Sequence, residues 1–467
     1  KNNGDIELID SNIAEAISYL SGIDKDTAHT ADGITASLAK FTATTTSVTA
    51  KSLTLTTAVD TITGGAGDDI VSGVIGYTAS SVAATTTSTF SAADIINAGA
   101  GNDTFKITVD TAPSAATTLP AFTATGLETV QVRNVSGQST TQDVGNVGGL
   151  TGVVNYLSTG SVDFDNIGTG DVTVIGNDGV TNGATLFSSS ASESITDALT
   201  IYVKDGVNAG AITSNHANDD WTAVTINVSG GTNTSAGTPA NVVGALDVAA
   251  GNLLQTLTID AATDFRTGAL IGWDTATTGV ANKGKVIVKG AGKVDLDGAV
   301  MNAAVQEVDA SASTGGVYVD ASTQTDFKFT GGSGDDRFQT DVALSTTTGS
   351  AGAVNGGAGT DRLIVNASTD ITEAIGALYT NFEVLEVQNA VSVDMDHVDG
   401  LTAVRINQAG NATGVTDLSA ADAAAITIVG TGAGAVTMAV KGAATIGQID
   451  TVTLAIDNGA SAEADLV

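Results

Sequence analysis

The chain has 467 residues, no cysteine, and 51 acidic side chains against 17 lysines and arginines, which gives a formal charge of −34. With this charge we do not expect nucleic acid as a partner, because neutralising its phosphates requires a basic face. The lack of cysteine excludes disulfide and thiolate-metal frameworks. The hydrophobic content is 42% but only 4% of residues are aromatic, so we expect cores built mainly from Val, Ile, Leu and Ala.

The first stretch of the chain differs in pattern from the rest. In "DSNIAEAISYLSG" apolar residues recur at helical spacing, and Asn12 with Glu15 forms a capping box. We expect a short helix and a polar linker over residues 1–51, as the end of an N-terminal domain that is not visible in this sequence. No apolar run approaches the ~20 residues of a membrane-spanning helix, so no transmembrane segment is expected.

From Ser52 onward, short alternating runs of Val, Ile, Leu and Thr are separated by Gly, Asn and Asp. Five runs share this plan, namely "GLETVQVRN", "LQTLTIDAAT", "AVQEVDASAS", "FEVLEVQNAV" and "LTAVRINQAG". Alternation over about seven residues predicts β-strands, and irregular repetition is typical of stacked turns. We predict an all-β fold, an elongated parallel β-helix or β-solenoid built of several subdomains; an antiparallel sandwich is the alternative.

A larger repeat organises this region. "GGAGDD" and "AGAGND" precede "GLETVQVRN", and "GGSGDD" and "GGAGTD" precede "NFEVLEVQN" in the same order. This order indicates a duplicated cassette. We therefore predict a solenoid segment with the first cassette over residues 52–205, plain solenoid over 206–325, and a segment with the second cassette over 326–467.

Three of the motifs follow the pattern GGxGxDxUx in full, where U is a large apolar residue, and "AGAGND", which begins with Ala98, is a near match. Glycines allow tight turns through positive φ and expose carbonyl oxygens, and the aspartate adds a carboxylate at the same place. Six to eight oxygens from stacked turns suit Ca²⁺ better than a transition metal, and this nonapeptide is a known calcium-binding β-helix repeat. The predicted Ca²⁺ ligands and turn residues are Asp60, Gly65, Gly67, Asp68, Asp69, Asp94, Gly99, Gly101, Asn102, Asp103, Gly332, Gly334, Asp335, Asp336, Gly357, Gly359 and Asp361.

The spacing of aspartates suggests a difference between the cassettes. Asp60 lies nine residues before Asp69, and Asp94 lies nine before Asp103, so each motif of the first cassette extends to one and a half nonapeptides. Residues 327 and 352 of the second cassette are not aspartates. A calcium site there would need its two turns to meet across an inserted loop.

Other candidate sites are weaker. "DFDNIG" at Asp163 begins like an EF-hand loop but has Val174 at the twelfth position, which predicts a solvated turn. "NHANDDW" contains a lone histidine, and "NKGKVIVKGAGK" predicts a strand with a solvated lysine face or a contact with an acidic surface. The sequence contains no HExxH, GxSxG or P-loop motif, so we do not expect an enzyme.

The cassettes resemble those of the RTX family, whose members leave Gram-negative bacteria by type I secretion. "LTTAVDTITGGAGDD" after a Thr-rich linker, in a Cys-free acidic chain, most resembles the lattice-forming part of calcium-dependent S-layer proteins. The similarity covers about residues 52–400. It implies a secreted protein on the bacterial cell surface that contacts copies of itself and binds Ca²⁺, with lipopolysaccharide held through a separate N-terminal domain.

Two classes of function remain open. One is a structural protein that self-assembles into an S-layer lattice with calcium as a staple. The other is an RTX adhesin or the calcium-binding portion of a type I secreted exoenzyme. The motifs are dispersed along the chain rather than consecutive, which favours the structural lattice.

Overall fold

The computed structural model divides into two compact units, residues 1–49 and 50–467, and each is considered by itself. The described residues are 49–77, 87–110, 115–178, 180–189, 198–215, 221–233, 239–248, 254–273, 284–296, 301–347, 352–389, 392–407, 414–419, 422–430, 436–442 and 452–457. The predicted N-terminal helix lies outside these residues.

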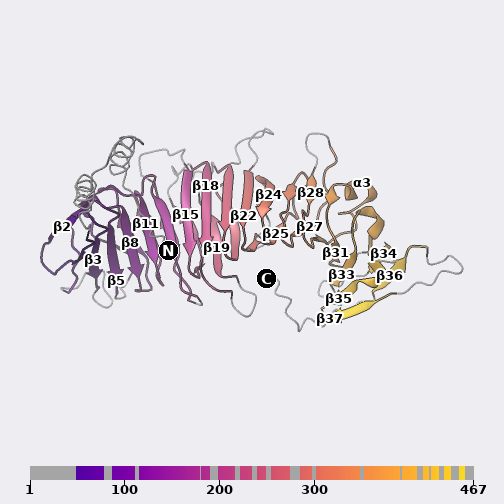
Figure 1. Cartoon of the computed structure of the whole chain (residues 1–467), viewed down its shortest axis with the longest axis horizontal. Coiled ribbons are helices and arrows are strands. Elements are labelled where there is room, and N and C mark those ends of the chain that lie inside the picture. The colour runs from indigo at the N-terminus through magenta and orange to yellow at the C-terminus, as the bar shows by residue number, and fades with distance from the viewer. Residues whose placement is uncertain are drawn as a thin grey trace, which may run out of the picture. The chain divides into compact units, whose positions relative to one another are not determined.

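Two long sheets form the frame of the second unit (Figure 1). The first long sheet contains, in spatial order, β1 (Ser52–Thr54), β3 (Ile70–Ile75), β5 (Thr104–Val109), β8 (Thr129–Asn134), β11 (Gly152–Tyr156), β13 (Asp171–Ile175), β15 (Ala198–Lys204), β18 (Ala223–Ser229), β20 (Thr256–Ala261), β22 (Gly284–Gly290), β24 (Val305–Ser313), β26 (Lys328–Thr330), β28 (Ala353–Asn355) and β30 (Tyr379–Thr380). The second contains β6 (Thr117–Thr118), β9 (Thr140–Asp143), β12 (Val162–Asp165), β14 (Thr185–Phe187), β17 (Ile212–Ser214), β19 (Asn241–Asp247), β21 (Phe265–Ile271), β23 (Val294–Asp295), β25 (Val317–Asp320), β27 (Arg337–Thr340), β29 (Arg362–Val365), β31 (Val384–Val387), β33 (Ala403–Asn407), β35 (Ile426–Val429) and β37 (Leu454–Asp457), with β16 (Asn208–Ala209) beside β19.

Smaller elements lie toward the two ends of the chain. The N-terminal small sheet contains β2 (Thr61–Gly65), β4 (Ile95–Gly99), β7 (Thr123–Thr125) and β10 (Val147–Gly148). The C-terminal small sheet contains β32 (Ser392–Asp394), β34 (Gly414–Leu418) and β36 (Thr437–Val440). The helical segments among the described residues are α3 (Glu373–Gly376), η1 (Met395–His397) and η3 (Asp422–Ala424). None of these helices is long and apolar enough to cross a bilayer.

Every strand pair among the described residues is parallel. The chain passes from sheet to sheet and back in successive turns of the solenoid, each of which is called a coil. Each strand therefore pairs with the equivalent strand of the next coil rather than with its neighbour in sequence. This arrangement confirms the predicted parallel β-solenoid and excludes the antiparallel sandwich. The five alternating runs form β8, β20, β24, β31 and β33, as predicted.

The core is a set of apolar columns that run from coil to coil. Val71, Phe105, Val130 and Val153 occupy matching positions of β3, β5, β8 and β11, and each is fully buried. Strand residues on either side of them point outward and are partly exposed. Because burying one such side chain contributes about 1.5–3 kcal/mol, repeated columns stabilise the stack, and their register fixes which turns lie above one another.

The two long sheets continue through the predicted subdomain boundaries. β15 pairs with β18 across residue 205, and β24 pairs with β26 near residue 325. The division by motif content therefore stays a prediction, and both cassettes adjoin the continuous first long sheet. The first cassette turns from the N-terminal small sheet into the first long sheet, and the second turns from the first long sheet into the second.

Candidate cation sites at two corners of the solenoid

The two motifs of each cassette lie on adjacent coils. The turns between β2 and β3 and between β4 and β5 stack because both flanking strands pair in register. The turns between β26 and β27 and between β28 and β29 stack in the same way. The structure therefore brings the two turns of the second cassette together across an insertion, as that site would require, although bound calcium there stays a prediction.

A ladder of carboxylates runs through the corner of the first cassette. The Lys51 N–H donates to Asp69 Oδ1 at 2.6 Å, and the Asp69 N–H donates to Asp103 Oδ1 at 2.6 Å. The Asp103 N–H then donates to Glu128 Oε2 at 2.7 Å. Each acidic side chain thus reaches back one coil to the backbone of the equivalent position. Such charge-assisted bonds to backbone N–H groups are among the stronger hydrogen bonds in proteins.

The second cassette builds the same ladder. The Val317 N–H donates to Asp336 Oδ1 at 2.6 Å, and the Asp336 N–H donates to Asp361 Oδ1 at 2.8 Å. The Asp361 N–H donates to Glu383 Oε2 at 2.8 Å. The lack of a doubled nonapeptide in this cassette therefore does not change the arrangement of its motif aspartates.

The two aspartates of one ladder differ in their second oxygen. Asp69 Oδ2 accepts from the Gly65 N–H at 2.5 Å, and Asp336 Oδ2 accepts from the Gly332 N–H at 2.8 Å. Asp103 and Asp361 are also fully buried, but their Oδ2 atoms have no hydrogen-bond partner. The same atom is therefore left unsatisfied in both cassettes. An unpaired buried anionic oxygen is costly unless a counter-charge reaches it.

Glycine serves two purposes in these turns. In the first motif of each cassette, a Cβ on Gly64 or Gly331 would overlap a carbonyl oxygen of the next coil. In the second motif, Gly99 and Gly357 have φ of +108° and +102°, which disfavours other residues. The predicted use of positive φ thus holds only for the second motif. The predicted turn glycines all lie in these corners, namely Gly65, Gly67, Gly99, Gly101, Gly332, Gly334, Gly357 and Gly359.

Burial controls the electrostatics of these corners. It raises the pKa of Asp103, and the Glu128 carboxylate raises it further. Burial likewise raises the pKa of Asp336 to about 6 and that of Asp361 to about 7. The backbone N–H donors of each ladder oppose these shifts. The corners therefore disfavour bare negative charge, and a bound cation would offset that cost.

The residues before the buried aspartates form an outer row. The Asn102 N–H donates to Asp68 Oδ1 at 2.8 Å, and the Thr360 N–H donates to Asp335 Oδ1 at 2.8 Å. Asp68, Asn102 and Asp335 are exposed, so these predicted ligands lie on the surface of the turn rather than in its interior.

Asp60 and Asp94 lie at a different corner from the motif aspartates. The Asp60 N–H donates to Asp94 Oδ1 at 2.9 Å, and Asp60 Oδ2 accepts from the Thr56 N–H at 2.6 Å. β2 and β4 separate this pair from Asp69 and Asp103. The nine-residue spacing therefore places carboxylates at opposite ends of one strand, so Asp60 stacks on Asp94 one coil away and not on Asp69.

The glutamates that end the ladders were not among the predicted site residues. Glu128 and Glu383 belong to matched turns on the third coil, Gly126–Glu128 and Asn381–Glu383. Gly126 and Asn381 have φ of +59° and +56°, and the middle residue of each turn is fully buried. The signal was present in the sequence, because "GLETVQV" and "NFEVLEV" occupy the same place after the two motifs.

The atoms at these corners that could coordinate a metal are oxygens, which are the ligands that Ca²⁺ prefers. Within the described ranges, no three or more His, Asp or Glu side chains converge as a metal-binding group. A cation at either corner would therefore take most of its six to eight ligands from backbone carbonyls and water. The unsatisfied Asp103 and Asp361 oxygens fit such an ion as its carboxylate ligands.

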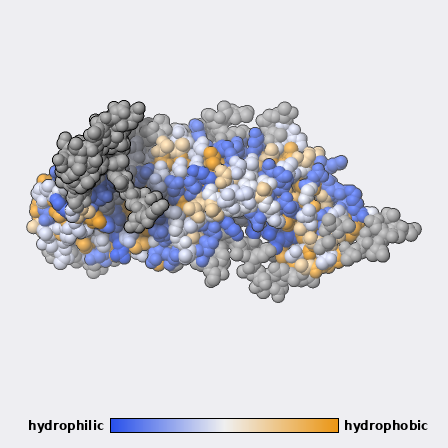
Figure 2. Space-filling model, viewed as in Figure 1, coloured by the Kyte–Doolittle hydropathy of each residue, from blue (hydrophilic) through white to orange (hydrophobic). Residues whose placement is uncertain are grey.

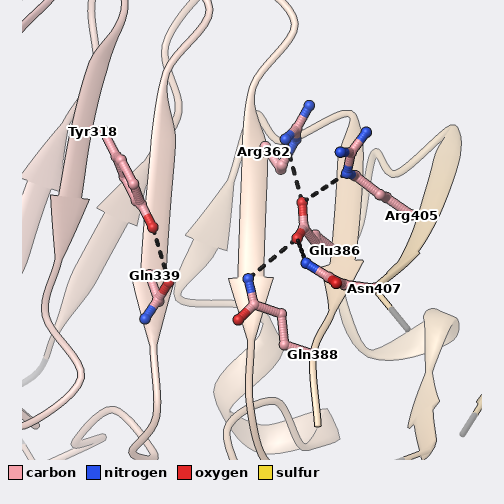
Figure 3. A network of polar contacts seen from close by, with 7 residues as sticks. All are labelled: Tyr318, Gln339, Arg362, Glu386, Gln388, Arg405 and Asn407. Atoms are coloured by element: carbon pink, nitrogen blue, oxygen red, sulfur yellow. Dashed lines mark hydrogen bonds and ion pairs between the residues drawn. The ribbon is translucent and has the colours of Figure 1, made fainter. Parts of the chain in front are cut away.

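A second polar network covers the outer face of the second long sheet, close to the second cassette (Figure 3). Glu386 Oε2 pairs with Arg405 Nε at 3.1 Å and with Arg362 Nη1 at 3.2 Å. Glu386 Oε1 accepts from Asn407 at 2.9 Å and from Gln388 at 3.1 Å. Glu386 lies on β31 and is 4% exposed, and its partners lie on β29 and β33 or directly after β31. The network links three adjacent coils through one carboxylate, and we call it the Glu386 staple.

The weaker candidates have structural roles where they are described. Lys285 pairs with Glu307 at 2.8 Å and with Asp309 at 2.9 Å, so the lysine strand contacts acidic side chains of the next coil. Asp163 belongs to strand β12 rather than to a solvated turn, and burial raises its pKa to about 6. The "NHANDDW" histidine, residue 216, and Lys283 lie outside the described residues.

No protein-family model matches this chain, and no curated protein matches it at a significant level. Function is therefore inferred from the geometry of the corners and from the chemistry of their residues.

Proposed function

We propose that this chain is a structural protein of the bacterial cell surface that assembles into a calcium-dependent two-dimensional S-layer lattice. The observation that carries the proposal is the pair of matched corners, each with a buried carboxylate oxygen that lacks a hydrogen-bond donor. The RTX resemblance supports Ca²⁺ as the ion and type I secretion as the export route, and the continuous pair of long sheets would serve as the building unit.

Calcium would act first on the stability of the coils. An ion that binds only the folded chain stabilises it by about 2.7 kcal/mol at a hundredfold excess over its Kd. The stability of a solenoid is close to the sum of the contributions from contacts between neighbouring coils. An ion at a corner would therefore strengthen the contact between two particular coils. Thermal unfolding in Ca²⁺ and in EGTA measures this stabilisation directly. Equal midpoints would show that calcium does not stabilise the folded chain.

The surface also bears on assembly. On the face shown in Figure 2, hydrophilic and apolar residues are interspersed. Among the described residues, the large exposed apolar side chains are Val59, Ile95, Val180, Ile271, Val452 and Leu454; apart from Val452 and Leu454, they are widely separated in sequence. Copies of the chain, each with a formal charge of −34, repel one another. Cations that neutralise facing carboxylates would therefore promote heterologous contacts that repeat without closing.

The test is assembly across a calcium titration, followed by light scattering and negative-stain electron microscopy. We expect two-dimensional arrays in millimolar Ca²⁺ and dispersal to monomers in chelator. Mg²⁺ should substitute poorly, because it requires smaller, near-octahedral sites and dehydrates reluctantly. A chain that binds calcium but stays monomeric at every concentration would contradict the lattice and favour an adhesin or exoprotein.

A further inference from the structure

The two motif aspartates of a cassette are chemically different, and the difference is the same in both cassettes. Both oxygens of Asp69 and of Asp336 accept backbone N–H groups at 2.5–2.8 Å. Asp103 and Asp361 accept one such bond through Oδ1 and none through Oδ2. The first aspartate is therefore satisfied by the protein itself, whereas the second is not.

The backbone of the second motif explains the missing donor. In the first motif, the N–H of the second glycine, Gly65 or Gly332, donates to the aspartate Oδ2. The equivalent glycines of the second motif, Gly99 and Gly357, have positive φ. The Gly357 N–H donates to Asn355 Oδ1 at 3.0 Å instead. In the second cassette the N–H that would serve Asp361 Oδ2 is thus used elsewhere, and in both cassettes the second aspartate keeps an anionic oxygen without a donor inside the corner.

We propose that each cassette holds a single Ca²⁺ at its second motif, with Asp103 Oδ2 and Asp361 Oδ2 as ligands and with Glu128 and Glu383 as positioning residues. This inference rests on the proposed calcium function and locates the ion within it. The first-motif aspartates, Asp69 among them, then act as structural acceptors that hold the stack together.

The glutamates position the liganding aspartates through the backbone. Glu128 Oε2 accepts the Asp103 N–H at 2.7 Å and Glu383 Oε2 accepts the Asp361 N–H at 2.8 Å. The adjacent Leu127 and Phe382 are fully buried and anchor the two turns. Groups that orient a ligand in this way change metal affinity about 10–100-fold when they are removed.

The first experiment compares Asp103→Asn with Asp69→Asn in the full chain, by counting bound Ca²⁺ with isothermal titration calorimetry. Asn at 103 still offers an oxygen to the Asp69 N–H, but it replaces Oδ2 with an amide group. We expect Asp103→Asn to lower the stoichiometry by one ion per chain, and Asp69→Asn to keep the stoichiometry while lowering the melting temperature in EGTA. The second cassette serves as an internal folding control, because its site should titrate unchanged in both variants.

The second experiment compares Glu128→Gln with Glu128→Ala. Glutamine keeps an acceptor for the Asp103 N–H, so we expect its calcium affinity at the first cassette to stay within about threefold of wild type. Alanine removes the acceptor and should weaken that affinity at least about tenfold. Equal losses in both variants would show that the carboxylate itself is a ligand and would overturn the positioning role.

The outcomes separate this inference from the proposed function. Equal loss of one ion in Asp69→Asn and Asp103→Asn would overturn the asymmetry and leave calcium-dependent assembly standing. A wild-type chain that binds no Ca²⁺ would overturn both. A chain that shows the expected asymmetry yet never forms arrays would support this inference and refute the lattice.

Discussion

The first ladder lies at the corner between the N-terminal small sheet and the first long sheet, whereas the second lies between the two long sheets. The first begins at Lys51, which is exposed and adjoins β1 and β2, the outermost strands of their sheets. The second begins at Val317, which is buried, with further coils on both sides. The hydrogen-bond pattern is nevertheless the same. The motif and its stacking therefore determine the ladder, and the flanking sheets do not.

The surroundings of the ladders differ more than their geometry. The coils of the second cassette carry the Glu386 staple, in which Arg362 directly follows Asp361 and Glu386 lies on β31, the strand that follows Glu383. We infer that this staple helps to hold the second corner in shape without calcium.

Removing the staple should give the largest effect. In Glu386→Ala, two partly buried guanidinium groups lose their shared carboxylate, which costs about 3–5 kcal/mol for a buried pair. Urea unfolding of the calcium-free chain measures the loss. The matched control is Glu307→Ala, whose pair with Lys285 is more exposed and should cost below about 1 kcal/mol. Similar costs in both variants would show that the second cassette is not stapled.

Alanine at the first glycine of a cassette should have an intermediate effect. In Gly64→Ala and Gly331→Ala, the new methyl group would meet the carbonyl oxygen of the next coil. Overpacking of this kind costs about 1–3 kcal/mol. Gly210→Ala is the control, because a Cβ there has nothing within 4 Å, and it should change the free energy of unfolding by less than about 0.5 kcal/mol. A loss of stability in Gly331→Ala but not in Gly64→Ala would show that the first corner relaxes around the added methyl group, whereas the second does not.

A smaller effect concerns pH. Burial raises the pKa of Asp370, in the loop after β29, to about 6. Between pH 4 and 6 the folded chain therefore keeps a proton that the unfolded chain has released, and the free energy of unfolding falls as the pH rises through this window. Asn at this position can still accept the Asn366 and Ala367 N–H groups that Asp370 Oδ2 accepts. Asp370→Asn should flatten the pH profile in EGTA without abolishing folding, and an unchanged slope would contradict the shift.

The sequence alone determined the strands and the turns, because both depend on short-range patterns. Alternation placed β8, β20, β24, β31 and β33 correctly, and Gly-Asp spacing located both cassettes. Irregular repetition of these runs favoured parallel stacking, with an antiparallel sandwich as the alternative until the structure excluded it. These features need only local backbone preference and one buried face per strand.

Only the tertiary structure decided which residues meet at a corner. Asp69 contacts Asp103 across 34 residues and Asp336 contacts Asp361 across 25, distances that the insertions set and the motif does not contain. The separation of Asp60 from Asp69, the role of Glu128 and the unsatisfied Asp103 oxygen all depend on the register between coils. Register is fixed by the packing of buried columns along the whole solenoid, so a nine-residue pattern could not reveal which carboxylate would be left without a donor.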